Sequence, residues 1–174
     1  MIYIVRHGET DYNVEGRIAG RIDISLNENG INQAYELREI LKNVKFGYVF
    51  SSPLKRALET TKIICDNEII KDDRIIERSN GDLEGILKSE IVDFPDFNDP
   101  NEKRYNIENI NIFRKRIFDF FNDIKNKYKG KDILIVTHAG VGIYARCFFE
   151  GEPQDGNYLN YKISNCEVLK YKND

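Results

Sequence analysis

Arg6-His7-Gly8-Glu9-Thr10 follows directly on the apolar run Ile2-Tyr3-Ile4-Val5 near the start of the chain. A short apolar run bounded by a glycine turn is typical of a buried strand. An arginine and a histidine therefore stand side by side where that strand is expected to end. Side chains at such a strand end are well placed to line a ligand site.

The other of the two histidines in the chain has the same setting. His138 comes after the apolar run Ile133-Leu134-Ile135-Val136, with one threonine between them, and Ala139-Gly140 follows it. The carboxyl ends of parallel strands meet at one edge of a sheet, which is where open α/β sheets bind ligands. The sequence therefore predicts a single site that contains both histidines.

Strand-like and helix-like segments alternate along the chain, which predicts an α/β protein with a mostly parallel central sheet. Asn27 is a suitable helix cap, and Ser51-Ser52-Pro53 combines a serine cap with a proline at the first helical position. We expect helices over 28–44, 53–69, 110–128 and 141–149, and strands over 2–5, 46–50, 74–77, 133–136, 158–163 and 167–171. No repeat, low-complexity tract or linker divides residues 1–174, so we expect a single domain.

Two stretches are expected to be irregular. Residues 11–29 are polar and punctuated by glycine, and a loop of that length inside a compact domain is usually functional. Residues 86–107 are broken by Pro95 and Pro100 and show no regular period. We interpret 86–107 as a small lid-like excursion that determines substrate specificity.

Composition narrows the class of protein. The net charge is −3, so neither nucleic acid nor an anionic membrane surface is the expected partner. The three cysteines have no paired spacing, which is typical of a reducing compartment. No apolar stretch reaches the length of a membrane span, and the first apolar run is too short for a signal peptide. We expect a cytoplasmic protein whose partner is a small anion.

The residue types at the predicted sheet edge suit phosphate chemistry. Arg6 and His7 end one strand, His138 follows another, and Arg56 lies in the first turn of a helix that starts at the same edge. Arginine offers planar pairs of donors to phosphate or carboxylate groups. A neutral imidazole can attack phosphorus and divide one displacement into two easier steps, while the remaining donors steady the transferring oxygens. A glutamic acid could then protonate the leaving oxygen.

Taken singly, these residues have simpler interpretations. An isolated histidine is more often structural than catalytic, Arg56 alone would be a solvated helix residue, and Glu77 alone would be an exposed carboxylate. A zinc site is disfavoured, because two histidines and three unpaired cysteines complete no tetrahedral set. The glycines Gly8, Gly140 and Gly142 are too sparse for a dinucleotide or P-loop fingerprint.

Together the residues match a known pattern. Arg6-His7-Gly8-Glu9-Thr10, with Asn13 three positions on, resembles the signature of the histidine phosphatase superfamily, which includes cofactor-dependent phosphoglycerate mutase. Further matches follow in the family's order: Gly16-Arg17 to Gln33-Ala34, Ser51-Ser52-Pro53-Leu54 with Arg56-Ala57 and Thr60, Glu77 with Gly81 and Glu84-Gly85, and Val136 to Val141. Ile107-Glu108-Asn109 partly matches the family's Gly-Glu-Ser before the long helix.

The resemblance implies a role for each matching residue. His7 would be the nucleophile that becomes phosphorylated, and Glu77 would be the proton donor and then the base that activates water. The transferring phosphoryl group would be bound by Arg6, Arg56 and His138, with secondary contacts from Thr10 and Asn13. The resemblance also implies a three-layer α/β/α sandwich and a reaction without a metal or other cofactor.

The expected function is hydrolysis of a small phosphorylated metabolite by a metal-independent phosphomonoesterase with a phosphohistidine at His7. The alternatives are a phosphoglycerate mutase, a protein phosphohistidine phosphatase and a non-catalytic anion-binding protein. The intact Glu77 motif counts against the second, and the complete set of nucleophile and acid counts against the third. The short stretches available to cover the site, 86–107 and 11–29, count against the mutase. The first is rich in acidic residues: Asp93, Asp96, Asp99 and Glu102. The chain is also shorter than mutases of this family usually are.

Overall fold

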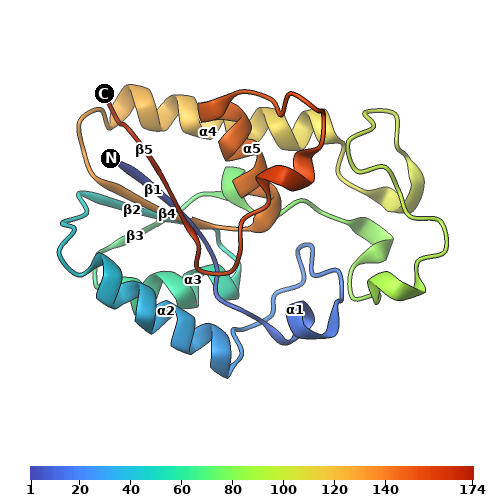
Figure 1. The fold of residues 1–174 in the computed structure, drawn as a ribbon, viewed down its shortest axis with the longest axis horizontal. Coiled ribbons are helices and arrows are strands. Elements are labelled where there is room, and N and C mark those ends of the chain that lie inside the picture. Colours follow the sequence, from blue (N-terminus) through green and yellow to red (C-terminus); the bar gives the residue numbers. More distant parts are fainter.

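A computed structural model describes residues 1–174 and shows one five-stranded sheet in the order β3-β2-β4-β1-β5 (Figure 1). The strands are β1 (Ile2–Arg6), β2 (Tyr48–Ser51), β3 (Ile69–Lys71), β4 (Ile133–Thr137) and β5 (Val168–Tyr171). All neighbouring pairs are parallel except β1 with β5, which is antiparallel. The prediction of a mostly parallel sheet is therefore confirmed.

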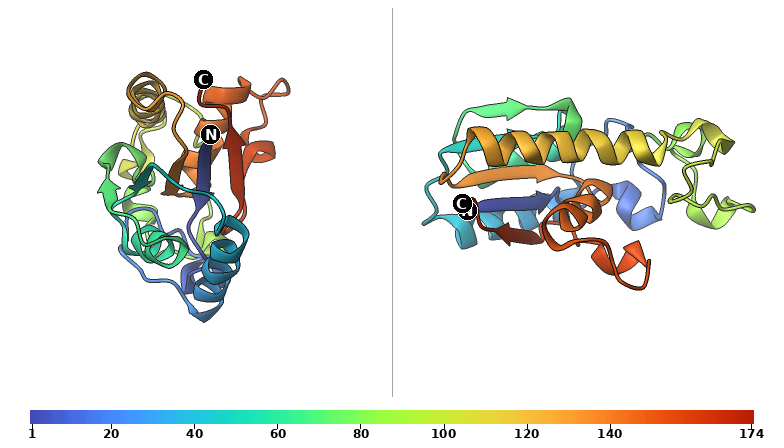
Figure 2. Two further views of the ribbon diagram at one scale, coloured as in Figure 1. Left: turned by 90° about the vertical axis from the view of Figure 1, so that its left-hand side faces the viewer. Right: turned by 90° about the horizontal axis from the view of Figure 1, so that it is seen from above.

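Helices cover both faces of the sheet and complete the three layers, with α4 and α5 on one side and α2 and α3 on the other (Figures 1 and 2). The helices are α1 (Asp11–Glu15), α2 (Glu28–Leu41), α3 (Lys55–Ile64), α4 (Ile110–Lys127) and α5 (Ala139–Glu150). The long α4 runs roughly along the strand direction when the molecule is seen from above (Figure 2). None of these helices is both long and apolar enough to cross a lipid bilayer.

The two layers of helices bury two separate cores because successive strand residues point to opposite faces. In β4, Ile133 and Ile135 pack into the larger core with α4 and α5. The alternate residues Leu134 and Val136 pack into the smaller core with α2 and α3. Strands buried on both faces read as continuous apolar runs, which is why the sequence identified β1 and β4 so directly.

The helix predicted over 53–69 is wrong at both ends. The serine cap is not used: Leu54 is the N-cap of α3, and Ser52 binds other groups instead. At Cys65 the backbone becomes extended and ends the helix. Ile69, at which the predicted helix ends, instead begins the edge strand β3, which pairs with β2.

Two predicted strands are short 3₁₀ helices instead. Asp73–Ile75 replaces the strand expected at 74–77, and Tyr158–Tyr161 replaces the one expected at 158–163. In both, a side chain before the helix accepts a bond from a backbone N–H two residues on: Asp72 from Arg74, and Asn157 from Leu159. Such local bonds compete with sheet pairing. The loop expected at 11–29 also contains the short helix α1.

The predicted lid segment projects beyond one end of the sheet, opposite the two chain termini (Figure 1). It contains two single turns of 3₁₀ helix, Lys88–Glu90 and Arg104–Asn106. A small apolar cluster of Ile18, Leu83 and Ile107 lies beneath it. Because Ile18 belongs to the long loop after β1, this cluster joins the lid segment to that loop.

Candidate active site

The pairing of β1 with β4 brings the two histidines together. Arg6 is paired with Thr137, so the next residues, His7 and His138, leave the sheet side by side. Their ring centroids are 5.2 Å apart. The two histidines therefore lie together at the carboxyl edge of the sheet, where the sequence placed them.

The contacts of His7 assign the proton on its ring. Nδ1 lies 2.7 Å from the carbonyl oxygen of Gly8, which can only accept, so Nδ1 carries the hydrogen. Nε2 is then the unprotonated nitrogen, and it accepts from Nε of Arg56 at 3.2 Å. Burial holds the pKa of His7 well below the ordinary value of 6.5, and the charges of Arg56 and Arg6 lower it further. His7 is therefore neutral at physiological pH, and the lone pair of its Nε2 faces Arg56.

Arg56 is fixed by the loop that follows β1. It is the second residue of α3 and its side chain is among the largest fully buried ones, with the residue 1% exposed. Its Nη2 donates to the carbonyl of Gly20 at 2.7 Å and its Nη1 to that of Ile22 at 2.8 Å. The loop predicted to be functional thus holds the guanidinium beside His7.

Two buried nitrogen atoms at the site have no partner within the protein. They are Nε of Arg6 and Nδ1 of His138. The Ser52 hydroxyl oxygen accepts from the Leu54 N–H and lies 2.6 Å from Nε2 of His138, so we assign its hydrogen to that nitrogen and the remaining ring hydrogen to Nδ1. Buried donors without a partner are costly, so each of these two nitrogens is a candidate to bind an anionic ligand.

Asn13 and Thr10 form a small network beside His7. Oδ1 of Asn13 accepts from the backbone N–H and the hydroxyl of Thr10, both at 3.1 Å, and from Asn165 at 3.3 Å. These contacts orient the amide so that its NH₂ group is not used within the network. Thr10 is fully buried, and its hydroxyl hydrogen is directed at Asn13.

Glu77 reaches the same edge from the segment after the first 3₁₀ helix. Its carboxylate accepts from the N–H of Gly140 at 3.1 Å and from that of Arg78 at 2.9 Å. A Cβ atom at Gly140 would lie 2.5 Å from Oε1 of Glu77, so the glycine leaves room for the carboxylate. Burial lowers the pKa of Arg6 and of Arg56, and the negative charge of Glu77 opposes that shift in both. The structure therefore brings all the sequence-predicted site residues to one edge.

Three polar residues that were not proposed as site residues also belong to this region. Ser52 contacts His138, and Thr60 links the Gly8 N–H at 3.0 Å to the Arg56 carbonyl at 2.7 Å. Ser52 and Thr60 both lie in the second sequence motif, so that motif could have indicated them as site residues. Asn165 donates to the carbonyl of His7 at 2.9 Å, and no pattern in the sequence marks it. No group of three or more histidine, cysteine or carboxylate side chains is arranged to hold a metal ion.

Because two histidines are buried, we expect the free energy of unfolding to decrease in mild acid. Burial holds the pKa of His138 well below 6.5, as it does that of His7, whereas in the unfolded chain both titrate near that value. Between the folded and unfolded pKa values the unfolded chain binds more protons, so lowering the pH favours unfolding. The expected loss is up to about 1.4 kcal/mol per pH unit for each histidine.

Urea unfolding at several pH values between about 7 and 5 measures this slope, in a window above the ordinary carboxylate range. The variant His138→Gln should show about half of the wild-type slope, because one of the two groups is removed. A free energy of unfolding that stays constant over this window would contradict the assignment of two neutral buried histidines.

Comparisons with known proteins bear on this site. Residues 2–174 match the family model of the histidine phosphatase superfamily (branch 1). The chain is 34% identical over 179 residues to the uncharacterized phosphatase PhoE of Bacillus subtilis. That alignment covers 98% of this chain and 90% of PhoE. It is 36% identical over 160 residues to a metal-independent phosphoserine phosphatase of Arabidopsis thaliana. That alignment covers 83% of this chain and 67% of the plant protein. A mutant phosphoserine phosphatase from Entamoeba histolytica in complex with phosphoserine has a TM-score of 0.84 and 26% identity, over 96% of this chain and 87% of that chain.

Proposed function

This chain belongs to the histidine phosphatase superfamily (branch 1), and on that premise we propose that it is a metal-independent phosphomonoesterase acting through a phosphohistidine at His7. Membership confirms the resemblance carried by the ordered motifs, and the phosphatase relatives establish the chain as a phosphatase. The finer proposal depends on one observation above all. Nε2 of His7 is unprotonated and lies beside a buried guanidinium at a site with two unsatisfied buried nitrogens.

In the first step of the proposed reaction, the lone pair of His7 Nε2 forms a bond to phosphorus and the bond to the ester oxygen breaks. Glu77 in its acid form gives its proton to that leaving oxygen. Arg6, Arg56 and His138 donate hydrogen bonds to the transferring oxygens and stabilise the charge that develops on them. The Gly8 carbonyl accepts from Nδ1 of His7 and so favours the cationic ring that phosphorylation creates.

In the second step, Glu77 is a carboxylate and removes a proton from water as the water oxygen attacks phosphorus. The bond between phosphorus and Nε2 breaks, which releases inorganic phosphate and returns His7 to its neutral form. The proton taken from water restores the acid form of Glu77, so the cycle is balanced. The positive charge of two guanidiniums is available throughout, and no step needs a metal ion.

We propose small phosphate esters as substrates, with phosphoserine first among them because two of the relatives are phosphoserine phosphatases. Residues 86–107 would select the ester group, since this segment contacts the residues next to the proposed acid. Nη1 of Arg78 donates to the carbonyl of Phe97 at 2.5 Å, while the backbone N–H of the same arginine holds Glu77. The Tyr144 hydroxyl lies 3.3 Å from Oδ1 of Asn98 in the same segment.

The test is a panel of phosphorylated metabolites assayed for phosphate release before and after dialysis against a chelator. We expect at least one small ester to be hydrolysed with a kcat of about 1–10³ s⁻¹, and dialysis to change that rate less than about twofold. In a second arm, 3-phosphoglycerate is supplied with catalytic 2,3-bisphosphoglycerate. We expect free phosphate rather than 2-phosphoglycerate, because the acidic lid disfavours retention of a second strongly anionic ligand.

Each arm can contradict the proposal in its own way. Formation of 2-phosphoglycerate faster than phosphate release from any ester would replace the phosphatase with a mutase. Loss of activity on dialysis, restored by a divalent ion, would overturn the metal-independent mechanism. Binding of phosphate without turnover of any ester would favour the anion-binding alternative.

A further inference from the structure

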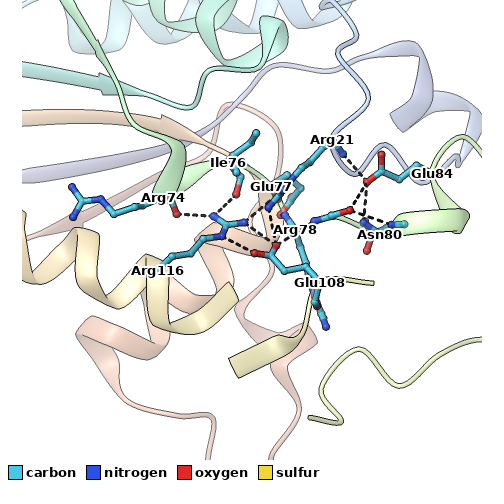
Figure 3. Close-up of polar contacts among 11 residues, drawn as sticks. Arg21, Arg74, Ile76, Glu77, Arg78, Asn80, Glu84, Glu108 and Arg116 are labelled. Carbon is cyan, nitrogen blue, oxygen red and sulfur yellow. Dashed lines mark hydrogen bonds and ion pairs between the residues drawn. The ribbon is translucent and has the colours of Figure 1, made fainter. Parts of the chain in front are cut away.

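The segment that carries Glu77 is held by side chains rather than by regular secondary structure. It lies between the 3₁₀ helices Asp73–Ile75 and Gly81–Leu83, and no backbone N–H donates to the carbonyls of Ile76 and Glu77. Arg116 of α4 supplies hydrogen-bond donors to the carbonyls of this region. Its Nη1 donates to the carbonyls of Arg74 and Ile76, each at 2.7 Å, and its Nη2 to that of Glu77 at 3.2 Å (Figure 3).

Glu108 joins this arginine to a second one. Nε and Nη2 of Arg116 donate to the two carboxylate oxygens of Glu108 at 2.9 and 3.0 Å. Arg21 donates to the same carboxylate through Nη2 at 3.1 Å (Figure 3). The Glu108 and Arg116 side chains are only 12% and 15% exposed, so this pair is well shielded from water. Paired donors in fixed planes make the arrangement geometrically specific.

Arg21 contacts the backbone of the proposed acid from the other side. Its Nε donates to the Glu77 carbonyl at 3.1 Å, and Figure 3 shows its side chain lying beside Glu77 and Glu108. Its own backbone N–H donates to Oε1 of Glu84 at 3.0 Å, and that oxygen also accepts from Asn80 at 2.9 Å. Arg21 is therefore bonded twice to the stretch that begins with Glu77.

The same short stretch also holds the phosphoryl-binding arginine. Gly20 and Ile22, the neighbours of Arg21, supply the two carbonyls that accept from Arg56. Three consecutive residues thus contact both the guanidinium beside His7 and the backbone of the proposed acid. A small displacement between these two groups would place the proton donor out of line with the leaving oxygen, and such errors are costly to catalysis.

We propose that Arg21 is a positioning residue that keeps the acid Glu77 aligned with the phosphoryl-binding Arg56. The inference rests on the proposed function, because it assumes that Glu77 protonates the leaving group. Arg21 itself does not touch the reacting atoms. The Arg21 side chain is 39% exposed, and in a variant that lacks it Arg116 still donates to the Glu77 carbonyl. Removing it should therefore misalign the acid without unfolding the site.

The test measures Arg21→Ala on two substrates: the alkyl phosphate that the panel shows to be hydrolysed fastest, and 4-nitrophenyl phosphate. A poor alkoxide leaving group needs the acid, whereas nitrophenolate does not. We expect kcat/KM, which reports the phosphorylation step, to fall about 10- to 100-fold on the alkyl ester and less than about threefold on the aryl ester. The inhibition constant of inorganic phosphate should change less than about twofold, because Arg56 keeps both of its carbonyl acceptors.

Two further variants sharpen the test. In a Glu77→Gln background, Arg21→Ala should cause no additional loss on the alkyl ester, since residues that act through one group are not additive. Arg38→Ala is the matched control. Arg38 is 38% exposed, pairs with the carboxylate of Asp66 and donates to the carbonyl of Ile63, but it lies on α2 away from the site. Arg38→Ala should leave both rates unchanged.

Several outcomes would overturn the inference. Equal loss on the two esters, additive loss with Glu77→Gln, or a similar loss in Arg38→Ala would each show that Arg21 does not act through the acid. If Glu77→Gln separates the two esters and Arg21→Ala does not, only the inference about Arg21 fails. If Glu77→Gln does not separate them, or if the wild type hydrolyses no ester, the proposed mechanism fails and the inference fails with it.

Discussion

His7→Ala is expected to lower kcat by about 10⁴-fold or more on every phosphate ester that the wild type hydrolyses. The substitution removes the nitrogen that forms the bond to phosphorus, and no other side chain at the site is placed to replace it. His138 is the nearest other imidazole, but its Nε2 is bonded to Ser52 and the ring hydrogen assigned to Nδ1 makes that atom a donor. Only the binding and the charge stabilisation that the remaining side chains supply should be left in this variant.

Rapid quenching of the wild type with ³²P-labelled substrate provides the direct measurement. We expect a labelled adduct on His7 that is stable in base and labile in acid, as phosphoramidates are. His138→Gln is a useful comparison, because it removes a proposed donor while retaining the nucleophile, so it should slow turnover but still form the adduct. Substantial activity in His7→Ala, or label on another residue, would show that the nucleophile has been assigned wrongly.

The second large effect is expected for Glu77→Gln on alkyl phosphates. General acid catalysis contributes about 10²–10⁴-fold when the leaving group is a poor one, and the amide has no proton of suitable acidity to give. The kcat/KM for 4-nitrophenyl phosphate should fall far less, since nitrophenolate departs without protonation in the first step. The measured quantity is the ratio of the two kcat/KM values, because kcat/KM reports the phosphorylation step and not the later attack of water. The ratio also removes any common loss from the fraction of folded protein.

Glu59→Gln is the matched control for this prediction. Glu59 is half-buried on α3, and its carboxylate accepts from the backbone N–H of Leu26 at 2.8 Å, much as Glu77 accepts from Gly140. The control therefore removes a similar charge from a carboxylate that accepts a similar bond, without touching the proposed chemistry. It should leave the ratio of alkyl to aryl rates unchanged. An equal loss of kcat/KM on both esters in Glu77→Gln would mean that the carboxylate does not act as the acid of the first step.

The central strands could be predicted because their sequence and their environment carry the same information. β1 and β4 are buried on both faces, so each is a continuous apolar run, and the polar residues that follow mark the sheet edge. The helix α2 was equally clear from its Asn27 cap, whose side chain accepts from Gly30 as expected. The two strand-end histidines followed from these elements, and the ordered motifs supplied the remaining candidates.

The edge strand β3 could not be predicted, because its existence depends on what lies beside it. β3 has only three residues, which is too short for the sequence to indicate a strand. It forms because it pairs with β2. The 3₁₀ turns at 73–75 and 158–161 are similar cases, in which one side-chain bond to the backbone prevails over a short apolar pattern. Short segments of this kind are decided by their surroundings.

Residue types and motif order therefore determined which side chains gather at the sheet edge, since both are written along the chain. The tertiary structure alone decided how they are held. Asn165 reaches the carbonyl of His7 across 158 positions, and Arg21 reaches that of Glu77 across 56. A backbone carbonyl is the same chemical group in every residue, so no sequence pattern marks which ones a distant side chain will bind. That choice comes from packing, which determines how the backbone carbonyls of His7 and Glu77 are held.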